Sequence, residues 1–281
     1  MLEHGHAQLS EPTRRLLRDE QAFRFHMGLR PGDAVGFFQP SPSGTMLLGE
    51  RRRWLNETPG RYASALPGAE PVLAEFGRAA SGWLGDPALA ISGSADAQIL
   101  AFGRHLEPDL LFLLPSEDGL WRLCAGAVCF PSSWALEEKM GRPLSAIHEP
   151  VPGLNTALDR HIATFLGRLE PKAAWERSNW GLSADNELNR HPARGLGRLE
   201  STASLDSVWL RVEHQLLLRL SATGGLVFGI RLEIVPLSGL MGDTGARVAL
   251  ASALDSMPEP VADYKGVSRI RKRLSMELRG A

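Results

Sequence analysis

The chain has little cysteine and no long apolar run, and each absence excludes a class of protein. Its 281 residues include two cysteines, Cys124 and Cys129, so neither a disulfide framework nor a four-cysteine zinc or iron–sulfur site can be built. The longest apolar run in the middle of the chain, at 110–114, is far shorter than the roughly 20 residues that span a bilayer. The glycine pattern GxGxxG, which cradles a dinucleotide, is also missing.

The chain also lacks an excess of either charge. Its 31 lysines and arginines nearly balance its 32 aspartates and glutamates, for a net charge of −1, which argues against nucleic acid or an anionic membrane as a partner. With 43% hydrophobic and 22% charged residues, it has the composition of a globular protein with a sizeable core. Residues 1–21 contain no apolar h-region, so we expect no secretory signal and a cytoplasmic location.

Hydrophobic spacing predicts an α+β protein made of one integrated domain, because no internal repeat is found. We expect helices within 11–25, at 74–83, at 95–106 and at 133–140, the last ended by Gly141 and Pro143. A basic amphipathic helix is expected at 266–278. Residues 40–50, PSPSGTMLLGE, have the composition of a loop, and 120–130 that of a short strand.

The clearest pair of elements is 208–220 and 226–235, joined by SATGG. Both segments alternate with period two on either side of a glycine-containing loop, which predicts an antiparallel hairpin. One face of the first strand is apolar apart from His214. The expected polar face of the hairpin holds Arg211, Glu213, Gln215, Arg219, Arg231 and Glu233. Cross-strand ion pairs would explain these charges, and an alternative is that some arginines bind carboxylates of a ligand.

Eight histidines are the first candidates for chemistry, at positions 4, 6, 26, 105, 148, 161, 191 and 214. We expect His4, His6, His26, His105 and His161 to be solvated. The role of His191, which precedes a proline, is left open. His148 lies in IHEPVPG, where two prolines stiffen the backbone and would hold an imidazole in a fixed direction for a metal or haem. From the residues alone, a backbone hydrogen bond at a turn is the favoured role for His148. A histidine such as His214 on an apolar strand face is more often a satisfied core residue than a ligand.

Two short segments combine aromatic and polar residues, Arg177-Ser178-Asn179-Trp180 and Tyr264-Lys265-Gly266. Both are first interpreted as structural hydrogen-bond anchors. No spacing in the chain supports a Ser/His/Asp or Cys/His arrangement. The residues alone therefore predict an α+β protein with a candidate ligand cavity.

A series of short segments follows in order from about residue 23 to 275. They are Phe25-His26-Met27-Gly28-Leu29-Arg30-Pro31, Trp54-Leu55 with Tyr62, Glu117-Asp118, Val128-Cys129-Phe130-Pro131-Ser132-Ser133-Trp134 with Glu138-Lys139 and Gly141, Ile147-His148-Glu149-Pro150-Val151-Pro152, Arg177-Ser178-Asn179-Trp180, Arg211-Val212-Glu213 with Gln215, Phe228 with Ile230-Arg231, and Tyr264-Lys265-Gly266. Together they resemble the haem-dependent oxidative N-demethylase-like family.

The resemblance implies a PAS-like antiparallel sheet with surrounding helices that holds b-type haem. The domain would cover 23–281, with a PAS-like core at about 105–245 and a C-terminal helix at 266–279, after an N-terminal extension at 1–22. The implied activity uses dioxygen to oxidise a small secondary amine, such as dimethylamine, and releases formaldehyde. The implied partner is a separate NAD(P)H-dependent reductase with flavin and an iron–sulfur centre.

The resemblance also assigns roles to residues. His148 would be the proximal iron ligand, with His214 and His191 in reserve. Arg177, Asn179 and Trp180 would line the pocket or contact the propionates. Glu213 and Arg231 would be the polar groups that act near the substrate or the haem edge. A carboxylate, Glu213 or Glu117, would attract the protonated amine, and both cysteines would be structural.

Two departures from the family pattern limit these expectations. His214 stands where the family has a second arginine or a similar polar residue, and Leu220-Ser221 stands where Leu-Pro is expected. The first departure changes a residue expected near the cavity wall, so it leaves the identity of the amine open. A second imidazole near the iron would favour sensing or electron transfer. The alternative function is therefore a non-catalytic haem-binding or small-ligand-binding PAS-type sensor.

Overall fold

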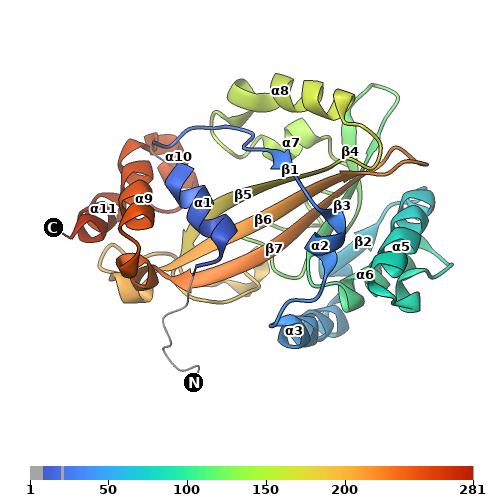
Figure 1. Ribbon diagram of the computed structural model, residues 1–281, viewed down its shortest axis with the longest axis horizontal. Coiled ribbons are helices and arrows are strands. Elements are labelled where there is room, and N and C mark those ends of the chain that lie inside the picture. The colour runs from blue at the N-terminus through green and yellow to red at the C-terminus, as the bar shows by residue number, and fades with distance from the viewer. Residues whose placement is uncertain (1–8, 20–21, 281) are drawn as a thin grey trace.

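The computed structural model describes residues 9–19 and 22–280, so the expected solvation of His4 and His6 falls outside the described residues. The chain forms one α+β domain around a seven-stranded antiparallel sheet in the order β1-β5-β6-β7-β3-β4-β2 (Figure 1). The strands are β1 (Arg30–Pro31), β2 (Ala63–Ala65), β3 (Asp109–Pro115), β4 (Trp121–Ala127), β5 (Ala174–Ser183), β6 (Trp209–Arg219) and β7 (Leu226–Pro236).

Helices cover both faces of this sheet. The α-helices are α1 (Glu11–Asp19), α2 (Ala34–Phe38), α3 (Gly44–Glu57), α4 (Pro59–Tyr62), α5 (Glu70–Leu84), α6 (Ala95–His105), α7 (Leu144–His148), α8 (Leu154–Arg168), α9 (Thr244–Ser256), α10 (Glu259–Tyr264) and α11 (Arg271–Arg279). Short 3-10 helices lie at Pro87–Leu89, Pro192–Arg194, Leu205–Ser207 and Leu237–Gly242. Within residues 9–19 and 22–280, no helix has the length and apolar character needed to cross a membrane.

The two faces of the sheet are covered unequally. One face, here called the α1 face, packs against α1, α2, α5, α6 and α9, and its core contains Phe76, Phe102 and Leu216. The other, the α7 face, packs against α7 and α8 through a smaller cluster that contains Leu166 and Leu226. In Figure 1, α8 and α7 lie above the strands, and α2 and α3 lie below them. The larger apolar core is therefore on the α1 face.

The predicted hairpin is confirmed, since β6 and β7 pair along their whole length. The register between the two strands distributes their charged side chains over both faces of the hairpin, whereas one face was expected to hold them all. Arg231 pairs with His214, and cross-strand partners project to the same face. Arg231 and Glu233 therefore share the α1 face with His214, and Glu213 projects to the α7 face. The expectation of one common polar face is wrong. The loop between the strands sets the register, and the register cannot be derived from the periodicity of each strand alone.

Two predicted elements are wrong. Helix α3 begins at Gly44, inside the expected loop, because its later residues Arg51 and Leu55 are fully buried and stabilise the whole helix. Residues 133–140 form bends and turns instead of a helix. Ser133 has a φ of 67°, which interrupts helical geometry at its first residue. The Gly141 N–H then donates to the carbonyl of Leu123 in β4.

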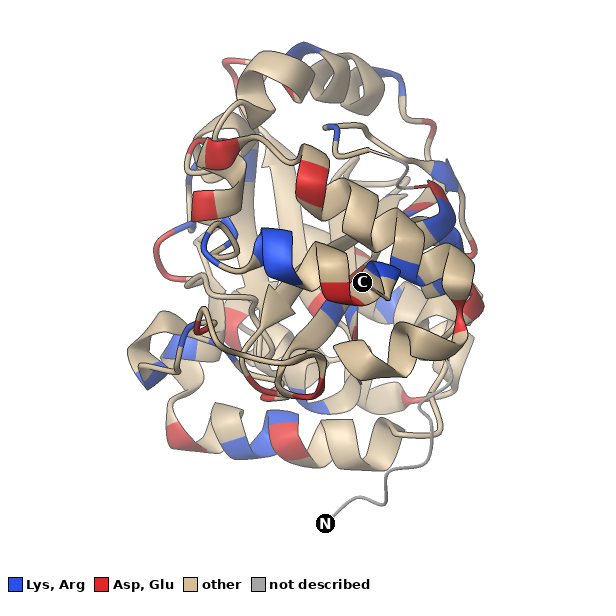
Figure 2. Cartoon of the chain, turned by 90° about the vertical axis from the view of Figure 1, so that its left-hand side faces the viewer, with Lys and Arg blue, Asp and Glu red and all other residues tan. Residues whose placement is uncertain are grey.

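The C-terminal helix is confirmed but starts later than predicted. Residues 267–270 form a turn, and α11 begins at Arg271. Gly266 has a φ of 68°, the left-handed conformation in which helices commonly end. The Val267 N–H donates to the Ala262 carbonyl across this end of α10. Acidic and basic residues are interspersed over the side of the molecule that carries the C-terminal helices (Figure 2), as the small net charge predicts.

Candidate functional site

Polar residues gather on the α7 face where β5, β6 and β7 lie side by side. Residues two apart on a strand project to the same face, and the registers between the strands align them. The neighbouring side chains of β7 are apolar and half-buried. The group consists of Arg177 and Asn179 of β5, Glu213 and Gln215 of β6, and Ile230 and Leu232 of β7.

Arg177 is half-buried in this face of the sheet. Its guanidinium makes no hydrogen bond or ion pair within the described part of the chain, and its Nε is inaccessible to solvent. Burial lowers the pKa of Arg177, and the negative charge of Glu213 partly offsets this. A buried donor without a partner costs free energy. The arrangement therefore fits an anionic ligand that is absent from the protein itself.

His148 lies close to this guanidinium. It is the last residue of α7, which begins after Pro143 and is followed closely by Pro150. Its imidazole makes no hydrogen bond with the described residues. Burial, and then the charge of Arg177, lower the pKa of His148. A lowered pKa favours the neutral imidazole, which is the form that can ligate a metal.

Glu213 supplies a negative charge between these groups and the C-terminal helices. Its Oε2 accepts a hydrogen bond of 2.9 Å from Nε2 of Gln215, which is buried. Partial burial and the charge of Glu213 raise the pKa of Tyr264, the last residue of α10. The sequence interpretation treated Tyr264 as a structural anchor and missed its proximity to Glu213. Only the packing of α10 against the sheet brings the two residues together.

His214 lies on the α1 face with both ring nitrogens engaged. Its Nδ1 is 3.0 Å from the Ser178 hydroxyl, and its Nε2 is 2.9 Å from Oε2 of Glu233. The hydroxyl of Thr13 in α1 also lies 3.3 Å from Nε2. These contacts give His214 a structural role in attaching α1 to the sheet.

His191 is also engaged at both nitrogens. Its Nδ1 accepts from the Ala193 N–H, and its Nε2 lies 3.2 Å from Oε1 of Glu137. The ring is buried edge-on against Tyr62. Of the three histidines considered as iron ligands, His148 is the one without hydrogen bonds to the described residues.

Two further predicted site residues lie on the α1 face, away from the polar group. Arg231 donates to Oε2 of Glu107 at 2.7 Å and to the carbonyls of Phe37 and Gln39. Trp180 is buried in the cluster formed with α1 and α9, because it alternates with Asn179 along β5. The structure thus brings Arg177, Asn179, Glu213 and His148 to one face and places Arg231, Trp180 and His214 on the other.

Neither cysteine offers a thiolate. Burial raises the pKa of Cys124 to about 12 and that of Cys129 to about 12, so both are protonated at neutral pH. The described residues also contain no group of three or more His, Cys, Asp or Glu side chains placed to hold a metal ion. A single imidazole suits a metal that brings its own ligands, as iron does in a porphyrin.

These features define a one-domain α+β protein whose polar site lies on the less covered face of an antiparallel sheet. Residues 80–275 match the family described as haem-dependent oxidative N-demethylase, alpha subunit-like. The match covers more than half of the chain, and the chain belongs to this family. The family description indicates haem dependence, and its alpha-subunit wording points to a system of several components. The matched range contains every residue of the site described above.

Proposed function

We propose that the chain is the haem-binding subunit of an oxidative N-demethylase. It would use b-type haem and dioxygen to remove a methyl group from a small secondary amine such as dimethylamine. The observation that carries this proposal is the pair formed by His148 and Arg177: an imidazole with its pKa lowered, and a half-buried guanidinium with an inaccessible Nε, neither of which makes a hydrogen bond with the described residues. A haem would satisfy both, because its iron would take the His148 imidazole as a ligand and its anionic propionates would pair with Arg177.

The residues of the α7 face would hold the haem by complementary contacts. His148 would ligate the iron through its neutral imidazole. Arg177 would donate charge-assisted hydrogen bonds to a propionate carboxylate, a geometry that a guanidinium matches with two parallel bonds. Ile230 and Leu232 are half-buried and would contact the flat macrocycle. Pairing Arg177 with a propionate would also remove the cost of its buried, unsatisfied donors.

The bound haem supplies the reaction with dioxygen and the oxidation of the amine. Glu213 would attract the protonated amine and accept its proton at a carboxylate oxygen, leaving the nitrogen lone pair exposed. Gln215 fixes the orientation of this carboxylate by its hydrogen bond. The phenol of Tyr264, which is 52% exposed, is protonated at neutral pH even at the ordinary tyrosine pKa of about 10, so it could donate a hydrogen bond to substrate. Asn179, paired with Glu213 across the strands, offers a further amide.

The overall reaction requires electrons from outside the chain. Dimethylamine, dioxygen, two electrons and two protons give methylamine, formaldehyde and water. We propose that the electrons come from a separate NAD(P)H-dependent reductase with flavin and an iron–sulfur centre. The proposal further takes the domain as 23–281 with a PAS-like core at about 105–245, and the location as cytoplasmic.

The first test is the absorption spectrum of the haem-supplemented full chain, compared with His148→Ala. We expect a Soret band that is lost or shifted in the variant, since the axial ligand is removed. His105→Ala is a matched control, because His105 is paired with Asp86 at the surface, and its spectrum should equal that of the wild type. An unchanged Soret band in His148→Ala would contradict the assignment of His148.

The second test separates an enzyme from a sensor. The haem-loaded chain is supplied with dimethylamine, dioxygen and a chemical or enzymatic reductant, and formaldehyde is measured. Formaldehyde formed in proportion to amine consumed supports the demethylase. Haem binding without turnover would instead support the PAS-type sensor, and a chain that takes up no haem would overturn both haem-based functions.

A further inference from the structure

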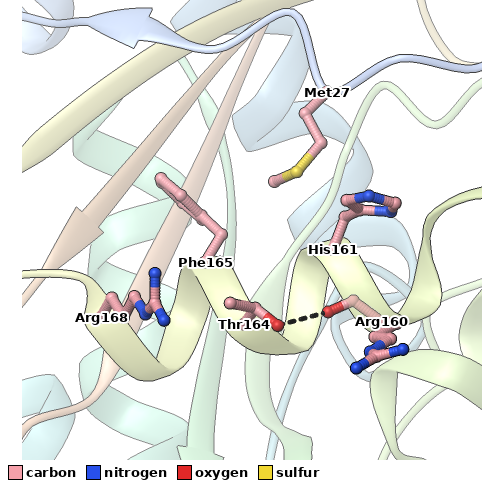
Figure 3. A pocket seen from close by; sticks show the side chains of 6 residues that line it. All are labelled: Met27, Arg160, His161, Thr164, Phe165 and Arg168. Atoms are coloured by element: carbon pink, nitrogen blue, oxygen red, sulfur yellow. Dashed lines mark hydrogen bonds between the residues drawn. The ribbon is translucent and has the colours of Figure 1, made fainter.

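The outer side of α8 carries a hollow that the site on the α7 face does not use. It has a volume of about 470 Å³ and is here called the α8 hollow. Figure 3 shows Met27, from the segment before β1, pointing towards α8, with Phe165 of that helix beside it. The lining residues are Met27, Arg160, His161, Thr164, Phe165 and Arg168.

The rim of the α8 hollow is basic and unpaired. Arg160, His161 and Arg168 are exposed, and their side chains make no hydrogen bond or ion pair with residues 9–19 and 22–280. Asp159 is the one acidic residue in the sequence of α8. Residues 22–31, which include Met27, contain no acid and two arginines, Arg24 and Arg30, of which Arg30 is paired with Glu176. A chain with a net charge of −1 thus has a locally positive surface here, which attracts an acidic partner.

The α8 hollow also lies one layer of side chains from the candidate site. Phe165, in its lining, contacts Trp175 edge to face, with ring centroids 5.5 Å apart. Trp175 projects from β5 to the α7 face, two residues before Arg177. A protein bound at the hollow would therefore come close to the group held by His148 and Arg177, and electron transfer requires such proximity.

We propose that the α8 hollow is the docking site for an acidic protein that delivers electrons one at a time. This inference rests on the proposed function, which requires two external electrons for each turnover. In each encounter one electron leaves the donor, which is oxidised, and the haem iron is reduced from ferric to ferrous. No bond is formed or broken in this step. Met27 and Phe165 provide the apolar centre of the contact, and Arg160 and Arg168 provide its charged rim.

The test uses a plant-type [2Fe–2S] ferredoxin as the acidic donor and the full chain as the receptor. Binding is measured by titration calorimetry at low salt for the wild type, for Arg160→Glu/Arg168→Glu and for Arg78→Glu. The double variant should bind at least ~10-fold more weakly, because two attractions become repulsions. Arg78 is an exposed, unpaired residue of α5 among the described residues, so its reversal should change affinity less than ~2-fold.

The kinetic counterpart is the rate of haem reduction by the same ferredoxin. The rate should fall by a similar factor in the double variant, and it should fall with added salt in the wild type. Reduction by dithionite, a small reductant that needs no docking site, should be equal in all three proteins. Equal ferredoxin binding by the double variant, or no binding by the wild type at low salt, would overturn the docking proposal.

The outcomes distinguish this inference from the function on which it rests. If the chain takes up no haem but binds ferredoxin through Arg160 and Arg168, the proposed function fails and the acidic docking surface stands. If haem binds and is reduced equally in all variants, the function stands and the docking site is wrong. If the double variant instead changes the mass of the chain in solution, the hollow is a contact between copies and the proposal is overturned.

Discussion

The α1 face and the α7 face are built from the same strands, yet they differ in whether a half-buried arginine and a histidine find hydrogen-bond partners within the chain. On the α1 face, Arg231 is paired with Glu107 and two carbonyls, and His214 is bonded at both nitrogens. On the α7 face, Arg177 and His148 have no hydrogen-bond partners among the described residues. The comparison separates residues that stabilise the fold from residues that are candidates for binding a ligand.

This separation has a physical basis. A polar group taken out of water must recover its lost hydrogen bonds within the protein, or it lowers the stability of the fold. The α1 face recovers them with the residues of the chain. On the α7 face, Arg211 recovers them from the carbonyls of Glu187 and Leu188, whereas Arg177 and His148 leave them unmade among the described residues. A polar residue that is shielded from water and unpaired within the chain is a candidate for a contact with something outside the chain.

The largest expected effect is the difference in the free energy of unfolding between Arg231→Met and Arg177→Met, both in the haem-free protein. Arg231→Met leaves Glu107, whose side chain is 4% exposed, without its ion-pair partner, so the free energy of unfolding should fall by about 3–5 kcal/mol. Arg177→Met removes a buried charge that has no partner, so the free energy of unfolding should change by less than about 1 kcal/mol or rise. Urea denaturation measures both. Equal losses would show that Arg177 has a structural role and that the two faces do not differ.

The next effect concerns Glu233, which fastens α1 to the sheet. Its carboxylate accepts hydrogen bonds from Ser10 and Thr13 and contacts His214. Despite burial, these contacts lower its pKa from 4.5 to about 2. The ionised carboxylate thus stabilises the folded chain fully above its unfolded pKa, and this stability is lost as the pH falls from about 4.5 towards 2.

Glu233→Gln should therefore cost about 2–3 kcal/mol at pH 7. The difference in free energy of unfolding between variant and wild type should shrink between pH 5 and pH 2, as measured by urea denaturation at each pH. Glu200→Gln is the control, because Glu200 is exposed and its loss should change stability by less than about 0.5 kcal/mol. A constant difference across this pH range would show that the hydrogen bonds of Glu233 do not depend on its charge.

The smallest effect concerns backbone strain beside the α7 face. Ser133 has a φ of 67°, and Lys172, in the turn between α8 and β5, has a φ of 65°. Replacing either residue with glycine relieves the strain but adds entropy to the unfolded chain, so each should stabilise by about 0.5–1 kcal/mol. Ser133→Gly should also weaken haem binding, since it loosens the chain next to Trp134, which packs against the same apolar cluster as Ile147 of α7, the helix that ends at His148. Equal haem affinity of Ser133→Gly and Lys172→Gly in a titration would show that residue 133 does not help to position His148.

The sequence was most informative where local periodicity and tertiary structure agree. The hairpin β6–β7 and the helices α5 and α6 were predicted close to their observed bounds. Local composition misled at α3, where a loop-like sequence is held in a helix by the burial of Arg51 and Leu55. It misled again at residues 133–140, where a left-handed residue and hydrogen bonds to β4 replace the expected helix.

The site was less predictable than the fold. The family resemblance predicted roles for Arg177, Asn179, Glu213 and His148, and those roles stay predictions. It could not show that Arg231 lies on the opposite face, because that depends on the register across the loop at 220–225. Neither could it show that Tyr264 approaches Glu213, since the contact joins residues far apart in the chain. Pairing between distant elements decides both cases.

The strand order has a consequence for aggregation. The two edges of the sheet are the shortest strands, β1 with two residues and β2 with three. Short edges leave few unpaired backbone groups that could recruit a strand from another molecule. Both come from the first 65 residues, outside the range 80–275 that matches the family. β1 pairs with two of the ten residues of β5, and β2 pairs with three of the seven residues of β4. A fragment trimmed to that range would lose this pairing and gain longer open edges, so it should associate edge to edge more readily than the full chain.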